Sequence, residues 1–272
     1  MTKATTNQLL NAARAIKDDE FYTPFEFIAA ELDRYDFGGA PIVCPCDSDR
    51  SNFVAYFRSK GIEPVYNAGD YRYALRRAPK GSIVVTNPPF SLFRDFVNLL
   101  LNGAPASLLF NTSPIEPHRF IVVGHKTAPT LRPIFKAIKE GRLWTSDGGP
   151  RNCHFYRPTD GETKEVGVNW FTNLEPTSPA ARRSIVSKKG YTVADLKELG
   201  LYKFIDDRPN VLYIDRIENI PVDYVGLIAV PFSDPHLYAP PIFEYVDLVS
   251  APVVDGATHF SKVIVRKILK SA

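Results

Sequence analysis

The chain has 272 residues, of which 44% are hydrophobic and 23% charged, and its formal net charge is +3. This composition is typical of a globular protein large enough to bury a substantial core. No apolar run reaches the roughly 20 residues of a bilayer-spanning helix, and the polar start lacks the apolar segment of a signal peptide. We therefore expect a cytoplasmic (intracellular) protein with no membrane partner. The three cysteines lack the paired spacing of a zinc site or a disulfide framework, so no metal is expected.

Segments of helical spacing alternate with short apolar runs through the first half of the chain. Helical spacing spans 8–16, 25–32, 51–60 and 93–101, and the runs typical of buried strands occupy 41–44, 63–66, 82–86 and 106–110. Pro24 suits the first turn of the helix over 25–32, with Thr23 as its cap. This alternation predicts a parallel sheet with helices on both faces.

The second half of the chain has a different pattern. Beyond Gly148 it reads as strand and loop, and the runs 152–156 and 166–171 predict an antiparallel pair. We expect one α/β domain over residues 1–272, with a mainly parallel sheet, an antiparallel hairpin and irregular segments after about Phe120. Ligands of parallel sheets bind beyond the carboxyl ends of the strands. The residues predicted to share that rim are Asp47, those of 67–70, and Asn87.

Positive charge is concentrated in one stretch of this second half. Between Lys126 and Lys203, positive side chains outnumber negative ones by roughly six. Such a bias suits the neutralisation of nucleic-acid phosphates, and ordinary solvated surface charge is the alternative explanation. The candidate DNA-binding residues in this stretch are Arg182, Arg183, Lys188 and Lys189.

The segment Asn87-Pro88-Pro89-Phe90 is the candidate catalytic centre. Its two prolines directly follow a predicted buried strand, remove two backbone donors and fix two φ angles, which makes a rigid bend. Oδ1 of Asn87 and the carbonyl of Pro88 can accept both hydrogens of a planar amine, while Phe90 stacks on the ring that bears it. The amine lone pair is then free to attack an activated methyl group in line, without a covalent enzyme intermediate.

This tetrapeptide resembles the catalytic motif of amino-methyltransferases, and the chain as a whole resembles the EcoRI-type adenine-specific (N6) DNA methyltransferases. The resemblance rests on the segments 19–23, 44–53 and 84–94, and it continues weakly through 141–144, 169–174 and 220–226. It implies a Rossmann-like methyltransferase fold. The catalytic and cofactor core would span about 17–120, and the DNA-recognition segments with the remaining sheet would span about 121–272.

The resemblance also implies S-adenosylmethionine as the cofactor and double-stranded DNA as the partner, with the target adenine flipped out of the stack. Restriction protection, phage self-modification and regulation remain open as biological settings. The cofactor-binding residues that it implies are Phe21, Tyr22, Thr23 and Pro24 at the methionine end, Asp47 beside the amino acid moiety, Asp70 at the adenine amine, and Asn87.

Other readings of these residues stay open. The tetrapeptide also suits adenine in RNA, cytosine N4 and a protein glutamine amide, and the missing glycine-rich loop between Asp47 and Phe53 allows a catalytically inactive DNA-binding module. Asp47 could instead be a helix cap, Asp70 a turn residue, and Phe21 with Tyr22 a hydrophobic staple. The five histidines are expected to be ordinary surface or core residues, and Trp144 and Trp170 are expected to be core residues rather than groups that stack on a base.

Overall fold

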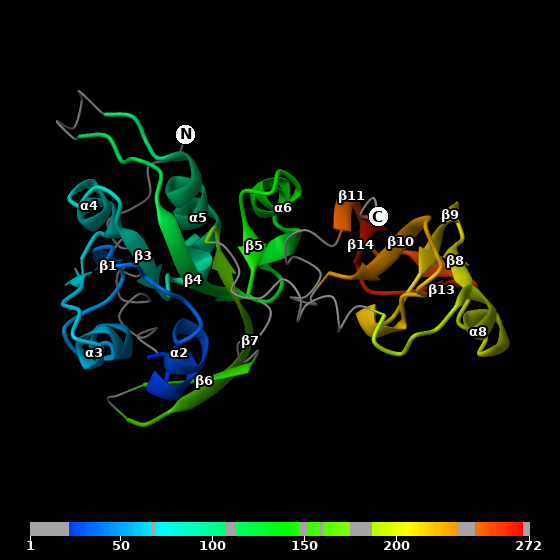
Figure 1. Ribbon diagram of the computed structural model, residues 1–272, viewed down its shortest axis with the longest axis horizontal. Helices are drawn as coiled ribbons and strands as arrows, with labels where there is room; N and C mark the ends of the chain where they lie inside the picture. The colour runs from blue at the N-terminus through cyan, green and yellow to red at the C-terminus, as the bar shows by residue number, and fades with distance from the viewer. Residues whose placement is uncertain are drawn as a thin grey trace, which may run out of the picture.

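The computed structural model describes residues 22–66, 69–106, 113–146, 152–157, 160–174, 187–232 and 243–268 (Figure 1). Its α-helices are α2 (Phe25–Leu32), α3 (Asn52–Ser59), α4 (Tyr71–Arg76), α5 (Phe93–Asn102), α6 (Arg132–Lys139) and α8 (Val193–Glu198), and its 3-10 helices are η1 (Phe90–Leu92), η2 (Ala128–Thr130) and η3 (Ile217–Asn219). Within these ranges no helix is long and apolar enough to cross a membrane. The helix expected over 8–16 lies outside the described residues.

The strands fall into two larger sheets and a short hairpin. Those of the first sheet are β1 (Ile42–Cys44), β2 (Val65–Tyr66), β3 (Ile83–Thr86), β4 (Arg119–His125), β5 (Trp144–Thr145), β6 (Asn152–Tyr156) and β7 (Thr163–Thr172). Those of the second are β8 (Lys203–Ile205), β9 (Arg208–Tyr213), β10 (Leu227–Pro231), β11 (Phe243–Val249) and β14 (Lys262–Lys267). The hairpin pairs β12 (Val253–Val254) with β13 (Ala257–Thr258).

The first sheet combines a parallel part with an antiparallel part. Strands β2, β1, β3 and β4 are neighbours in that order and all pair in parallel. Strand β7 then runs antiparallel beside β4 and pairs in turn with β5 and β6. The predicted strands over 41–44, 63–66 and 82–86 are thus confirmed as parallel neighbours. Residues 152–156 form a strand that pairs antiparallel with β7, as predicted, but they face residues 163–167, and most of the predicted partner 166–171 pairs with β4 instead.

Helices cover both faces of this sheet because its central strands are mainly apolar and must be buried on both sides. Every residue of β1 and β3 is buried, as the near-continuous apolar runs of strands covered on both faces require. One face packs against α2 and α3, where Phe27 stacks on the buried ring of Trp170 at 5.6 Å between centroids. The other face packs against α4 and α5. Trp170 is therefore a core residue, as expected.

Strand β4 corrects the expectation of irregular structure after about Phe120. The run from Phe120 to Val123 is fully buried, and Val84 of β3 lies opposite Phe120 in parallel register. Four consecutive apolar residues are enough for a short strand buried on both faces. The strand expected over 106–110 lies outside the described residues except for Ala106, which is in an irregular segment.

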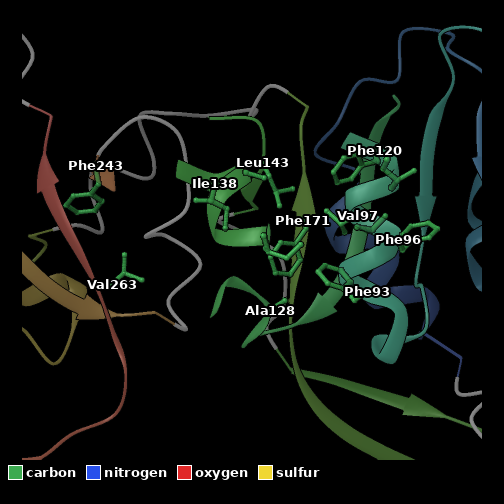
Figure 2. Close-up of a cluster of buried hydrophobic side chains, with 14 of the residues drawn as sticks. Phe93, Phe96, Val97, Phe120, Ala128, Ile138, Leu143, Phe171, Phe243 and Val263 are labelled. Carbon is green, nitrogen blue, oxygen red and sulfur yellow. The ribbon is translucent and has the colours of Figure 1, made fainter. Parts of the chain in front are cut away.

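The second sheet was not predicted. Its order is β11, β14, β10, β9, β8, and only the β9–β10 pair is parallel. Figure 1 shows it beside the first sheet with α6 between them, and α6 contacts both α5 and β11. The apolar cluster in Figure 2 runs from Phe93 of α5 through Phe171 and Ile138 towards Phe243 and Val263 of the second sheet. The two sheets therefore share one continuous hydrophobic core.

Candidate active site

The carboxyl ends of β1 and β3 lie side by side and bring Asp47 close to the segment that begins at Asn87. Oδ1 of Asp47 accepts a hydrogen bond from Oγ of Ser51 at 2.5 Å, and Oδ2 accepts one from Oγ1 of Thr86. Thr86 is the last residue of β3 and directly precedes Asn87. The predicted shared rim is therefore confirmed for Asp47 and Asn87, whereas residues 67–68 lie outside the described part of the chain.

Asp47 is a buried carboxylate with only 8% of its surface exposed. Burial raises the pKa of Asp47 to about 6, and the hydrogen bonds from Ser51 and Thr86 act in the opposite direction because they stabilise the ionised form. Asp47 is therefore mostly ionised at neutral pH. The N-cap of α3 is Ser51, whose Oγ accepts from the backbone N–H of Phe53 at 3.1 Å. The alternative that Asp47 caps this helix is wrong.

The side chain of Asn87 has an unusual environment. Its Oδ1 atom is buried and has no hydrogen-bond partner among the residues that the structure describes. A buried acceptor that is left unpaired costs free energy, and native structures rarely leave one without a reason. Pro88 is buried and Pro89 is exposed where η1 begins. The loop thus holds an acceptor ready for a donor that the described part of the protein does not supply.

Phe90 is held between aromatic rings from two other strands. Its ring centroid lies 6.2 Å from that of His125 and 6.0 Å from that of Phe155, both in edge-to-face geometry. His125 ends β4 and Phe155 belongs to β6. Partial burial and the nearby charge of Lys126 lower the pKa of His125, so its ring is neutral at neutral pH. These contacts fix the orientation of Phe90 and leave it half-buried.

Sequence reasoning missed His125, which was expected to be an ordinary histidine. The signal that could have found it is its position near the end of an apolar run, two residues after Val123. This run was not predicted as a strand, so the signal was not used.

The segment Tyr22-Thr23-Pro24 is attached to the same rim. Backbone hydrogen bonds pair Tyr22 with Tyr156 at 2.7 and 3.1 Å. Nδ2 of Asn52 donates to the carbonyl of Thr23 at 2.8 Å and to the hydroxyl of Tyr156 at 2.9 Å. Asn52 follows Ser51, so these bonds tie the segment to the start of α3. Phe21, predicted alongside these residues, lies outside the described part.

Thr23 does not cap α2 as expected. Pro24 occupies the N-cap position, and no side chain makes a capping hydrogen bond there. Instead, Oγ1 of Thr23 is buried, and no described residue forms a hydrogen bond with it. The rim therefore contains a second unpaired polar atom besides Oδ1 of Asn87, within a segment that the sequence assigned to cofactor binding.

Asp70 differs from Asp47 in its exposure and in its hydrogen-bond partners. It is exposed, caps α4 by accepting from the backbone N–H of Arg72 at 2.9 Å, and faces the guanidinium of Arg72 at 3.8 Å. This capping role accounts for an aspartate at this position. A cofactor contact by Asp70 stays a prediction.

The predicted DNA-binding residues are only partly described. Arg182 and Arg183 lie outside the described residues, whereas Lys188 and Lys189 are exposed in a turn before α8. The backbone of this turn bonds to η3, and the ammonium of Lys189 lies 5.5 Å from the ring centroid of Tyr191. The described contacts of the turn are thus with η3 rather than with the rim.

Several other positive charges of the segment from Lys126 to Lys203 have negative partners. Examples of these ion pairs are Arg142–Glu140 at 2.7 Å, Arg157–Asp160 at 2.9 Å and Lys203–Asp255 at 2.9 Å. Part of the positive excess read from the sequence is therefore neutralised locally. Among the residues that the structure describes, no group of three or more His, Cys, Asp or Glu side chains could hold a metal ion.

A mixed α/β fold with an amide acceptor, two prolines and a clamped phenylalanine at a strand end suits a methyltransferase that acts on an amine. The sequence matches the family of adenine-specific methyltransferase EcoRI over residues 9–63 and 60–270. The chain belongs to this family.

Named relatives agree with this family. Type II methyltransferase M.MpnI of Mycoplasma pneumoniae is 30% identical in an alignment of 295 positions that covers 89% of this chain and 86% of the relative. Type II methyltransferase M.EcoRI of Escherichia coli is 24% identical in an alignment of 320 positions that covers 90% of each. No solved structure matches the chain. The protein is thus a DNA adenine methyltransferase, which sets aside the inactive module and the other planar amines.

Proposed function

We propose that the chain transfers the methyl group of S-adenosylmethionine to N6 of an adenine flipped out of duplex DNA, on a Rossmann-like α/β core. The observation that carries this proposal is the buried, unpaired Oδ1 of Asn87 beside the clamped ring of Phe90. An acceptor and an aromatic platform are the two groups that an aromatic amine requires.

The rim fits the methyl donor in its charges and its unpaired atoms. S-adenosylmethionine, when bound, supplies an activated methyl group on a sulfonium. The ionised carboxylate of Asp47 suits an ammonium group, since its two bonds to hydroxyls leave further lone pairs free. The unpaired hydroxyl of Thr23 supports the assignment of Tyr22, Thr23 and Pro24 to the same ligand. Phe21, Asp70 and Asn87 complete the proposed set.

The residues of the catalytic loop act mainly on the amine, and Asn87 also borders the bound donor. Oδ1 of Asn87 and the carbonyl of Pro88 accept its two hydrogens, which directs the nitrogen lone pair away from the ring. Pro89 keeps the loop rigid, and Phe90 stacks on the adenine. Because the acceptor is preorganised and buried, little reorganisation is needed when charge develops on the nitrogen.

The DNA partner adds a separate requirement. An adenine inside a duplex must leave the stack at a cost of a few kcal/mol, and contacts to the phosphates offset that cost. We propose that residues 17–120 form the catalytic and cofactor core of one methyltransferase unit, and that the remainder, about 121–272, completes the sheet and recognises DNA. Arg182, Arg183, Lys188 and Lys189 are the proposed phosphate contacts, and restriction-modification is the proposed setting.

The experiment is methyl transfer from labelled S-adenosylmethionine to unmethylated plasmid DNA by the purified protein, followed by digestion and separation of the nucleosides. The label should be in N6-methyldeoxyadenosine, and RNA should accept none. Label in N4-methyldeoxycytidine, or no transfer to DNA, would overturn the proposal.

A further inference from the structure

We propose that Thr86 is a positioning residue that couples the Asp47 carboxylate to the catalytic loop. The inference rests on the proposed function, because it assigns Asp47 to the cofactor and Asn87 to the target amine. Its own basis is the hydrogen bond from Oγ1 of Thr86 to Oδ2 of Asp47, which joins β3 to the end of β1.

The geometry forms a chain of three side chains across the rim. Ser51 caps α3 and donates its hydroxyl to one oxygen of Asp47, and Thr86 donates its hydroxyl to the other. Thr86 has no exposed surface, so water does not compete for this bond. The carboxylate is thus fixed by a helix N-terminus on one side and by the residue before Asn87 on the other.

Thr86 and Thr172 are both buried threonines of the same sheet, but their hydroxyls donate to different kinds of acceptor. Thr172 donates to the backbone carbonyl of Phe120 at 2.7 Å and links β7 to β4, a structural bond between neutral groups. The Thr86 bond instead ends on an ionisable carboxylate. A hydroxyl that donates to a carboxylate stabilises its charged form and lowers its pKa.

The surroundings of Asp47 make this bond matter for its charge. Among the described residues that interact with Asp47, the other titratable groups are the thiols of Cys44 and Cys46, and burial raises the pKa of both, so both are neutral. The hydrogen bonds from the hydroxyls of Ser51 and Thr86 are therefore the interactions that stabilise the negative charge of Asp47. Loss of the Thr86 hydroxyl should both favour protonation of Asp47 and release the peptide that leads to Asn87.

The test compares Thr86→Val, which keeps the shape and removes the hydroxyl, with Thr86→Ser, which keeps the hydroxyl, and with Thr172→Val as the matched control. Three quantities are measured: cofactor affinity by calorimetry from pH 5 to 8, kcat with DNA, and the pKa of Asp47 by NMR of carboxyl-labelled aspartate, assigned with Asp47→Asn.

In Thr86→Val we expect the pKa of Asp47 to rise, the acid limit of cofactor binding to move to higher pH with it, and kcat to fall by about tenfold or more. Thr86→Ser should restore all three, and Thr172→Val should change thermal stability alone. An unchanged Asp47 pKa in Thr86→Val, or equal losses in both valine variants, would overturn the inference. Failure of the wild-type protein to methylate DNA would instead refute the proposed function, and the NMR measurement distinguishes the two because it needs no substrate.

Discussion

Polar groups at the rim of the first sheet differ in burial and in partners from those on the surface of the second sheet. At the rim, the Asp47 carboxylate is buried with hydroxyls as its partners, and Oδ1 of Asn87 is buried with none. On the second sheet, charges form exposed ion pairs, of which Arg208–Asp247 at 3.1 Å and Arg266–Glu244 at 3.0 Å are examples. Exposed pairs contribute little to stability, whereas buried unpaired groups are costly.

Lys262 of the second sheet sharpens this contrast. It is as buried as Asp47, yet its ammonium bonds to the carbonyl of Ile214 at 3.2 Å, faces Asp215 at 3.5 Å and lies over the ring of Tyr213. A buried polar group with protein partners is explained by structure. The comparison therefore shows that Lys262 is explained by its protein partners, whereas the unpaired Oδ1 of Asn87 is not.

The largest effect is expected from Asn87→Ala. Removal of the unpaired acceptor should abolish methyl transfer and change cofactor affinity by less than about tenfold, because the amide serves the target amine. Steady-state kinetics and calorimetry measure the two quantities. More than about a tenth of the wild-type rate would remove Asn87 from its role.

Asn173 offers a matched control for that variant. Both polar atoms of its amide are used, since Oδ1 accepts from the N–H of Phe120 at 2.8 Å and Nδ2 donates to the carbonyl of His118 at 2.9 Å. Asn173→Ala should therefore cost about 1–3 kcal/mol of stability and retain transfer per folded molecule. Loss of methyl transfer in Asn173→Ala, together with retained transfer in Asn87→Ala, would contradict the different roles assigned to the two amides.

Asp47→Asn should give two effects of opposite sign. Because burial raises the folded-state pKa of Asp47 from 3.8 to about 6, the folded protein loses stability as the pH rises through that window, by at most about 3 kcal/mol. The variant lacks this titration. As the pH rises from 4 to 7, the free energy of unfolding of the variant should therefore increase relative to that of the wild type. Urea unfolding at each pH measures this difference.

The same substitution should weaken cofactor binding at neutral pH. In the wild-type protein that affinity should fall as the pH drops below about 6, where Asp47 becomes protonated. Calorimetry across this range checks the effect. If cofactor affinity did not depend on pH and was unchanged in Asp47→Asn, Asp47 would not be a cofactor-binding residue.

A smaller effect is expected from Phe155→Leu. This change removes one of the two rings that hold Phe90 and should lower kcat severalfold, since a loosely oriented stacking ring loses part of its positioning effect. Cofactor affinity should stay as it is. Single-turnover rates with saturating DNA measure the change, and an unaltered rate would show that the contact with His125 is sufficient.

The smallest effect on transfer itself is expected from replacing Arg182, Arg183, Lys188 and Lys189 with glutamine. DNA affinity should weaken and depend less steeply on salt, because fewer counterions are released on binding. Transfer at saturating DNA should be largely kept. Binding titrations at several salt concentrations give the slope, and an unchanged slope would identify these charges as ordinary solvated surface.

The two regions also differ in how far the sequence predicted them. The strands that end at Cys44 and Thr86 are short apolar runs that stop at polar residues or prolines, so their ends, and with them Asp47 and Asn87, could be read directly. The second sheet offers no such pattern. Strand β11 alternates irregularly between buried and exposed residues and contains a register shift between Tyr245 and Asp247, which blurs the period of two on which strand prediction depends.

Contacts between segments far apart in the chain could not be predicted from the sequence for a different reason. The role of Phe155 depends on the pairing of β6 with β7, and the position of Tyr156 against Tyr22 links residues more than a hundred positions apart. Residue spacing carries no information about such contacts. Likewise, nothing in the spacing separates Ser51 from Asp47 as the cap of α3, because both precede the helix and both can accept a backbone hydrogen bond.

The central claim, that Asn87 directs methyl transfer to adenine N6 in DNA, is tested most directly in a host without adenine methylation. Genomic DNA from cells that express the wild-type chain, Asn87→Ala or Asn173→Ala is sequenced by a method that detects methylated bases. The account predicts N6-methyladenine at one recurring sequence with the wild type and with Asn173→Ala, and none with Asn87→Ala. Methylation by Asn87→Ala at the wild-type level, or of a base other than adenine by the wild type, would contradict it.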